Sequence, residues 1–226
     1  MPRPSRHLDR ALLAAGRELL PVHGCAGLTI RQVSDAAGVN IGMFHYHFRT
    51  REAFLRAVMQ NAYEEMFSRL TLRSPGEATA TAHLRAALRV IGRFLQANRA
   101  LLARVLADAL AGNGIARDFL RENFPRHLRV IVGLVAAGQE AGELRPMAPL
   151  QAFAFCAGAL GMALLVGGAL ADADTLPPEF REELRSAILT EEALDERIDL
   201  ALAALAAPGA KPKRKGKTTG IPAGCA

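Results

Sequence analysis

The stretch that begins at Thr29 carries the signals of two short helices joined by a tight turn, and it restricts the fold more than any other part of the chain. Thr29 and Gln32 have the spacing of a capping box, in which each side chain bonds the other residue's backbone N–H. Gly38 can end the first helix in a left-handed conformation. Asn40 can cap a second helix at 41–48. The stretch therefore predicts a helix-turn-helix.

The rest of the chain also shows helical spacing. Leu8, Leu12 and Leu19 share one face of an expected helix at 8–20, which Pro21 should end or kink. Ala and Leu dominate, Trp is absent and no strand-like alternation is found, so we expect an all-α fold. Caps and breakers delimit further expected helices at 51–70, 78–98, 100–111, 116–123, 125–142, 149–170, 178–188 and 191–206.

The breakers Ser74-Pro75-Gly76 suggest a division of the chain into an N-terminal module and a larger C-terminal part. The final segment is a low-complexity, lysine-rich run for which we expect disorder. The expected organisation is a three-helix helix-turn-helix domain at 1–50, a connecting helix at 51–75, a larger helical C-terminal domain at 76–207 and a basic tail at 208–226.

Positive charge is concentrated at the two ends of the chain. Residues 1–56 hold eight arginines against four acids, and residues 208–226 hold five basic residues and no acid. The part between them has more acidic than basic residues, although the whole chain has a formal net charge of +6. A basic terminal module suggests a polyanionic partner, with ordinary solubilising charge as the alternative. The lysine-rich tail is either solubilising or a sequence-independent contact to phosphates.

The second short helix has two different faces. Phe44 and Phe48 are four residues apart and can anchor one face in a core. In a helix-turn-helix, the second helix lies in the major groove of double-stranded DNA. His45 and His47 point about 200° apart, so they cannot chelate one metal ion, and we expect no metal site. Polar, basic or small residues suited to phosphate or base contact surround the unit at Arg31, Gly42, His45, Tyr46, His47, Arg49 and Arg51.

The stretch from Gly24 to Leu55 resembles, without a gap, the DNA-binding domain of TetR-type transcription regulators. The resemblance implies an all-α homodimer that reads a near-palindromic operator, with a C-terminal domain that holds a small-molecule pocket and the dimer interface. It favours a repressor that its effector releases from DNA. The matching positions are Gly24, Leu28, Thr29, Arg31, Val33, Ala37, Gly38, Val39, Gly42, Phe44, His47, Phe48, Thr50, Arg51, Glu52, Phe54 and Leu55.

Carried over position by position, the family's base contacts fall on Arg31, Gly42 and Met43. Its backbone contacts fall on Thr29, His45, Tyr46, His47 and Arg51, and we add Asn40 and Thr50 to the expected DNA-binding set. His45 stands where the family usually has Tyr, and because a protonated His bonds phosphate more strongly, we expect DNA affinity to depend on pH. Ile41 and Met43 replace polar or small residues and are suited to thymine methyl groups.

The C-terminal helices are expected to hold the effector pocket. Few charges fall on their apolar faces, which favours a small apolar effector. An apolar stripe at helical spacing is also what plain core shows, so the two interpretations stay open. The candidate lining residues are Phe94, Leu106, Phe119, Phe124, His127 and Phe155.

The run from Ala152 to Ala171 is uncharged over 20 residues, long enough to span a bilayer. It is mostly Ala and Gly, and no Lys, Arg or aromatic girdle flanks it, so we expect no membrane span. Small residues would instead let helices of two protomers approach closely in a four-helix bundle. The expected dimer interface consists of Gly158, Gly161 and Leu165 with Ile198, Leu202 and Leu205.

Other classes of function find less support. The chain has no Ser-His-Asp order, no Gly-rich phosphate loop and no suggestive carboxylate pair, so we expect neither an enzyme nor a cofactor. Cys25, Cys156 and Cys225 form no disulfide pattern, and the N-terminus shows no secretory signal, which favours the cytoplasm. The main alternative is a DNA-binding protein of the same fold that a protein partner controls, or that has no small-molecule ligand.

Overall fold

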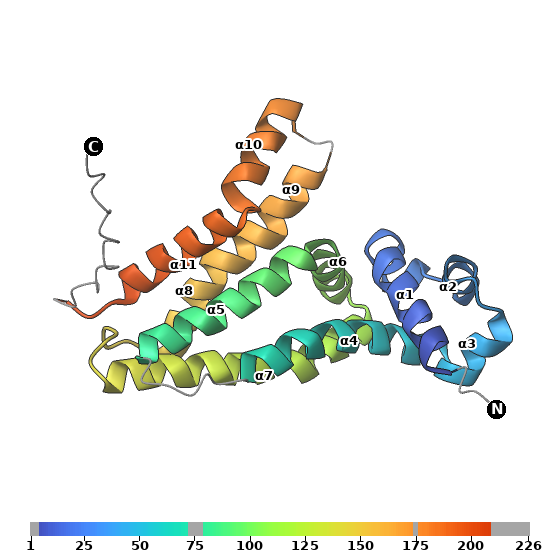
Figure 1. The fold of residues 1–226 in the computed structure, drawn as a ribbon, viewed down its shortest axis with the longest axis horizontal. Coiled ribbons are helices and arrows are strands. Elements are labelled where there is room, and N and C mark those ends of the chain that lie inside the picture. Colours follow the sequence, from blue (N-terminus) through green and yellow to red (C-terminus); the bar gives the residue numbers. More distant parts are fainter. Residues whose placement is uncertain (1–4, 72–78, 174–175, 209–226) are drawn as a thin grey trace, which may run out of the picture.

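The computed structural model describes residues 5–71, 79–173 and 176–208, and within these ranges the chain is helical (Figure 1). The expectation of an all-α fold is confirmed, since the β-type pairing in this part of the chain is an isolated bridge between Leu144 and Ala206. The helices are α1 (Ser5–Gly27), α2 (Ile30–Ala37), α3 (Ile41–Phe48), α4 (Arg51–Thr71), α5 (Ala80–Ala97), α6 (Arg99–Leu110), α7 (Gly114–Glu140), α8 (Pro149–Ala157), η1 (Gly158–Gly167), α9 (Gly168–Asp172), α10 (Pro178–Ile188) and α11 (Glu191–Leu205).

The helices form a small N-terminal module and a larger C-terminal part. Helices α1, α2 and α3 pack together at one end, and α4 leads from them into the larger part (Figure 1). α4 packs on α1 at its beginning and on α5 and α7 further along. Helices α9 and α10 project from the body as an antiparallel pair. Because α4 belongs to both parts, a shift of the C-terminal helices can reach the N-terminal module through it.

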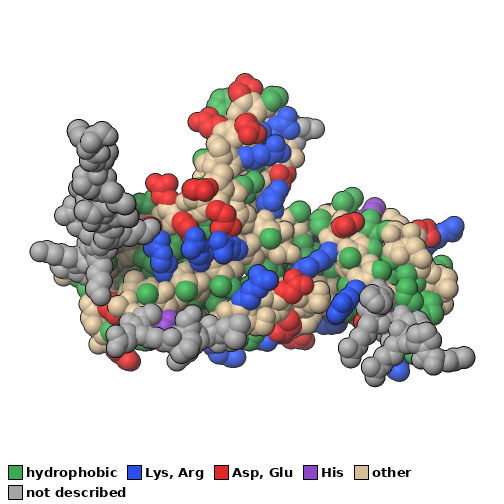
Figure 2. Space-filling model, viewed as in Figure 1, with side chains coloured by type: hydrophobic (Ala, Val, Ile, Leu, Met, Phe, Trp, Pro, Cys, Tyr) green, Lys and Arg blue, Asp and Glu red, His purple; other side chains and the backbone are tan. Residues whose placement is uncertain are grey.

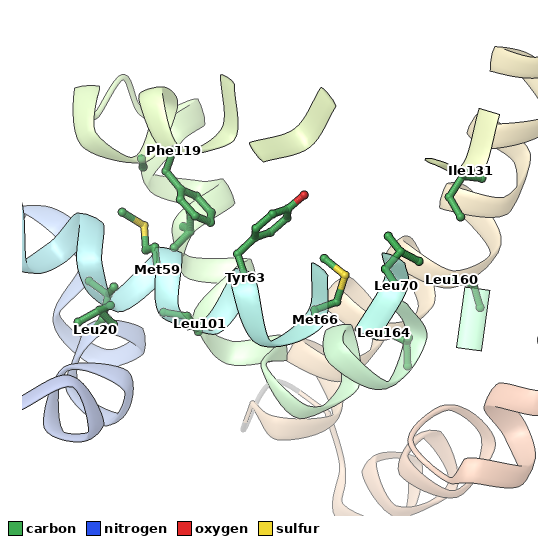
Figure 3. Close-up of a cluster of buried hydrophobic side chains, with 14 of the residues drawn as sticks. Leu20, Met59, Tyr63, Met66, Leu70, Leu101, Phe119, Ile131, Leu160 and Leu164 are labelled. Carbon is green, nitrogen blue, oxygen red and sulfur yellow. The ribbon is translucent and has the colours of Figure 1, made fainter. Parts of the chain in front are cut away.

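The hydrophobic core runs along α4 through both parts (Figure 3). Met59, Tyr63 and Met66 project from successive turns of α4 and are almost fully buried. Leu20 of α1 lies near the beginning of this row, and Ile131 of α7 lies near its end. The two parts therefore share one core instead of folding around separate ones.

Two prolines that were expected to break helices lie inside them. α1 continues through Pro21, and its kink comes at Gly24, where φ is 70°. α7 continues through Pro125, so the helices predicted at 116–123 and 125–142 are a single helix. An internal proline leaves the carbonyl four residues earlier without its helical partner. For Pro125 that residue is Arg121, which is exposed and can bond water instead.

The other helix limits agree with the sequence to within a few residues, which is the usual uncertainty of helix ends. The run predicted at 149–170 is a continuous helix to Asp172, and its middle, Gly158–Gly167, has π-type hydrogen bonding. The proposed boundary at Ser74-Pro75-Gly76 and nearly all of the basic tail lie outside the described residues. The division into domains therefore remains a prediction.

A series of ion pairs holds α11 against α5. The arginines are spaced four residues apart on α5, and their acidic partners run in the opposite direction on α11, so the helices are antiparallel. Facing rows of basic and acidic side chains are visible on this surface (Figure 2). Such exposed pairs each add little stability, but together they fix the register of α11. The pairs are Arg85–Asp199, Arg89–Asp195 and Arg93–Glu191.

Candidate nucleic-acid interface and ligand cavity

The helix-turn-helix is built by the local hydrogen bonds that the sequence predicts. Thr29 caps α2 by accepting from the N–H of Gln32 at 3.3 Å, and the Gln32 side chain accepts the Thr29 N–H at 2.9 Å. Gly38 ends α2 with φ at 64°. Asn40 caps α3 by accepting from the N–H of Met43 at 2.9 Å. The capping box, the glycine turn and the second cap are all confirmed.

One face of α3 is fixed in the core. Phe44 is fully buried, with ring centroids 5.7 Å from Phe48 and 5.1 Å from Phe54 of α4. The opposite face is open to solvent, where Tyr46 is 73% exposed and Ile41 is 45% exposed. A rigidly anchored helix with an open polar face is what reading the major groove requires.

Most residues of the expected DNA-binding set lie at this open surface. The exposed members are Thr29, Arg31, Asn40, Gly42, His45, Tyr46 and Thr50. Met43 and His47 are partly buried, and Met43 packs against the core. Among the described residues, the Arg31 guanidinium pairs with Asp35 alone, at 3.8 Å and on the exposed surface, so it can reach a DNA base.

Arg51 does not fit the expected role of a backbone contact. Its guanidinium is turned inward, where Nε donates to the carbonyl of Leu28 at 2.6 Å and Nη2 donates to the carbonyls of Cys25 and Ala26. These bonds join α4 to the C-terminal end of α1. The prediction for Arg51 is therefore corrected to a structural role, while the exposed Arg49 lies beside the open face of α3.

A buried carboxylate connects the N-terminal module to α6. Asp108 accepts the backbone N–H of Cys25 at 2.6 Å and pairs with Arg104 Nε at 3.0 Å. Arg104 also donates to the carbonyl of His23 at 3.4 Å. Burial, with a contribution from Asp108, raises the pKa of Cys25 to about 12, so its thiol stays protonated and unreactive near neutral pH. Sequence reasoning missed Asp108, whose partner is 83 residues away in the chain.

A cavity of about 250 Å³ lies between α4, α5, α6, α7 and the α8–η1 helix. Five of the predicted lining residues border it, namely Phe94, Leu106, Phe119, Phe124 and His127. Phe155 does not, since its side chain is 47% exposed on the outer face of the helix. Phe153 takes its place in the wall. Two positions along a helix turn a side chain by about 200°, which explains this correction.

Tyr63, Asn123 and His127 form a polar group in the cavity wall. The hydroxyl of Tyr63 donates to the backbone carbonyl of Asn123 at 2.8 Å and lies 3.3 Å from Nδ1 of His127. Burial raises the pKa of Tyr63 to about 12 and lowers the pKa of His127 from its usual range. Both side chains are therefore uncharged near neutral pH.

The helix Pro149–Asp172 is long and apolar enough to cross a bilayer by length and composition. Much of its outer face is exposed, including Phe155, Met162 and Val166. Of the residues predicted for the dimer interface, Gly158 is exposed, whereas Gly161 and Leu165 are partly buried and also border the cavity. The prediction for the α11 residues is corrected, because the protomer's own core buries Ile198, Leu202 and Leu205.

Comparison with known proteins places these features in a family context. Residues 12–58 match the family model for bacterial regulatory proteins of the tetR family. A search of curated proteins gave no match. The chain is similar in structure to the transcriptional regulator FadR of Bacillus subtilis in complex with stearoyl-CoA, at a TM-score of 0.66 and 16% identity, with 87% of this chain and 98% of that one covered.

Two further structures are similar over most of their length. A protein of unknown function from Rhodococcus sp. RHA1 has a TM-score of 0.63 and 24% identity, covering 91% of this chain and 100% of that one. A candidate fatty acid metabolism regulator of Clostridium perfringens has a TM-score of 0.62 and 21% identity, covering 79% and 96%. At these identities the likeness is one of fold.

Proposed function

We propose that this TetR-type chain is a cytoplasmic, sequence-specific DNA-binding regulator that acts as a homodimer, and that it is a repressor which a small apolar effector releases from its operator. The observation that carries the proposal is the open polar face of α3, held rigidly by its caps and by Phe44 within the stretch that matches the family. The cavity and the exposed apolar helix support the finer parts of the proposal.

In this proposal α3 lies in the major groove and α2 crosses the DNA backbone. Arg31 and Gly42 then face base edges, with the glycine letting the helix backbone approach closely. Tyr46 and His45 bond phosphates and set the orientation of the helix on the duplex. Arg49 replaces the inward-turned Arg51 as the basic contact after α3.

Replacing Arg31 or Tyr46 with alanine should weaken specific DNA binding by about 10- to 100-fold, as expected for the loss of a good contact. Both side chains are exposed, so folding should not change. Fluorescence anisotropy on DNA from upstream of the chain's own gene, with competitor DNA present, measures the loss. Arg121→Ala on the exposed surface of α7 is the matched control. Wild-type DNA affinity in both the Arg31→Ala and the Tyr46→Ala variant would contradict the proposed interface.

We propose that the outer face of Pro149–Asp172 binds a second copy of this chain. The exposed side chains along it are large and apolar, and a contiguous face of this kind on a soluble protein marks an interaction site. Gly158 has open space where a side chain would stand, so a partner helix can approach closely. A two-fold dimer gives two copies of α3, as a near-palindromic operator requires.

The cavity is the proposed effector site. Its lining is overwhelmingly apolar, and at about 250 Å³ it is larger than the roughly 150 Å³ cavity known to bind benzene. The similar FadR structure contains stearoyl-CoA, and the long apolar acyl chain of that ligand supports an apolar cavity occupant for this fold. An effector that binds the DNA-free arrangement more tightly shifts the population away from DNA.

An apolar ligand of this cavity, at 100 times its Kd, should stabilise the protein by about 2.7 kcal/mol and raise Tm by roughly 5–10 °C. The same ligand should release the protein from operator DNA. Leu106→Phe narrows the cavity from a partly exposed wall position, so it should weaken ligand binding and leave DNA binding intact. If no compound of an apolar panel shifts Tm or releases DNA, control by a protein partner becomes the better hypothesis.

A further inference from the structure

The polar atoms in the cavity wall are few, and most already have partners. Asn123 donates to the carbonyl of Phe119 at 3.0 Å and forms a reciprocal amide pair with Gln60. Its side-chain oxygen also accepts from Arg126 at 3.0 Å. Asn123 therefore has no donor hydrogen left for a ligand, since both are in use.

The hydrogen bonds around Tyr63 fix the tautomer of His127. The Tyr63 hydroxyl has one proton and donates it to the carbonyl of Asn123 at 2.8 Å. For the 3.3 Å contact between this oxygen and His127 to be a hydrogen bond, Nδ1 of His127 must donate. In the neutral ring Nε2 is then an acceptor, and it has no hydrogen-bond partner among the described residues.

The cavity offers nothing to balance a ligand's charge. None of the residues that border it is Lys, Arg, Asp or Glu. Arg126 lies nearby, but its guanidinium bonds the carboxylate of Glu64 through both terminal nitrogens and stacks on Phe67 with 4.0 Å to the ring centroid. A buried charge without a partner is strongly unfavourable, so the wall selects an uncharged ligand.

Resting on the proposed function, we propose that the cavity binds an uncharged, largely apolar molecule with one hydroxyl group, and that Nε2 of His127 accepts the hydrogen bond from this hydroxyl. The apolar body fills the space between Phe94, Leu106 and Phe119. Tyr63 acts as a positioning residue, because it holds the His127 ring in the accepting tautomer.

Two isomeric probes separate the hydrogen bond from apolar burial. 1-Decanol and methyl nonyl ether have the same atoms and similar length, but only the alcohol can donate. Isothermal titration calorimetry on the wild-type protein should show the alcohol binding up to about tenfold more tightly, as expected for one additional hydrogen bond. In His127→Phe, which keeps an aromatic ring against Phe124, the two affinities should become equal.

Two further variants make the outcome decisive. His127→Gln retains an acceptor oxygen and should keep part of the preference for the alcohol. Ile91→Val removes one methyl group from the wall and should weaken both probes alike. Equal affinities in the wild type, an unchanged preference in His127→Phe, or no binding of either probe would overturn the inference. The proposed function would survive each of these results if the protein still binds its operator specifically and another apolar compound releases it.

Discussion

Replacing Met162 and Val166 together with glutamate is expected to give a monomer that binds its operator at least about 100-fold more weakly than the wild type. The two side chains are 61% and 45% exposed on the outer face of the helix Pro149–Asp172. In the proposed dimer they meet the symmetry-related helix, where a carboxylate would be buried without a partner. A monomer contacts one half-site and loses the gain in affinity from binding both.

Light scattering after size exclusion measures the oligomeric state, and anisotropy on the full operator and on a single half-site measures the binding. The double variant should bind the half-site as well as the wild-type protomer does. Leu110→Glu, at an 81% exposed position on α6, is the matched control and should stay dimeric. A variant that remains a dimer would rule out this face, and wild-type protein that stays in membranes after carbonate washing would favour a bilayer as its partner.

The helix-turn-helix could be predicted closely because its determinants are local. Thr29 and Gln32 are three residues apart, as are Asn40 and Met43, and each cap closes within the segment itself. Both partners of each such bond lie within one short segment at a characteristic spacing, so reading the sequence finds them. The open face of α3 follows once Phe44 is assigned to the core.

What could not be predicted depends on contacts between distant segments. The inward turn of Arg51 is set by carbonyls at the end of α1, more than 20 residues earlier. Helix continuation through Pro125 depends on tertiary packing that outweighs the local cost of the proline.

The rotation of each C-terminal helix about its axis could not be predicted from the sequence either. Phe153 and Phe155 are both aromatic and two positions apart, and only the rotation of α8 decides which one borders the cavity. Ile198 and Leu202 are apolar, and an apolar face packs equally well on its own protomer or on a partner. The sequence pattern identifies a buried face of α11, but the neighbour that buries it is a property of the assembled fold.

The second large effect is expected at the junction between α6 and the N-terminal module. Asp108→Ala should destabilise the protein by about 2–3 kcal/mol, because it leaves the buried Cys25 N–H without an acceptor and removes the partner of Arg104. For a chain of this size, Tm should fall by roughly 5–10 °C. Asp108→Asn keeps an oxygen for the Cys25 N–H and should cost less. Asp172→Ala is the matched control. It removes the exposed α9 partner of Arg99, which like Asp108 lies on α6, and it should cost under about 1 kcal/mol.

If α6 carries the signal to the N-terminal module, a change at Asp108 should affect the release of DNA without affecting ligand binding. Leu106 borders the cavity two residues before Asp108 on α6, so a ligand that moves this helix pulls on the end of α1. Gly24, with φ at 70°, packs against Arg104 there and leaves little room for adjustment. In Asp108→Asn, the Kd for an apolar ligand should remain near the wild-type value, while more ligand should be needed to release DNA. If release is unchanged although Tm falls, Asp108 stabilises the junction without transmitting the signal, and α4 becomes the path between cavity and DNA.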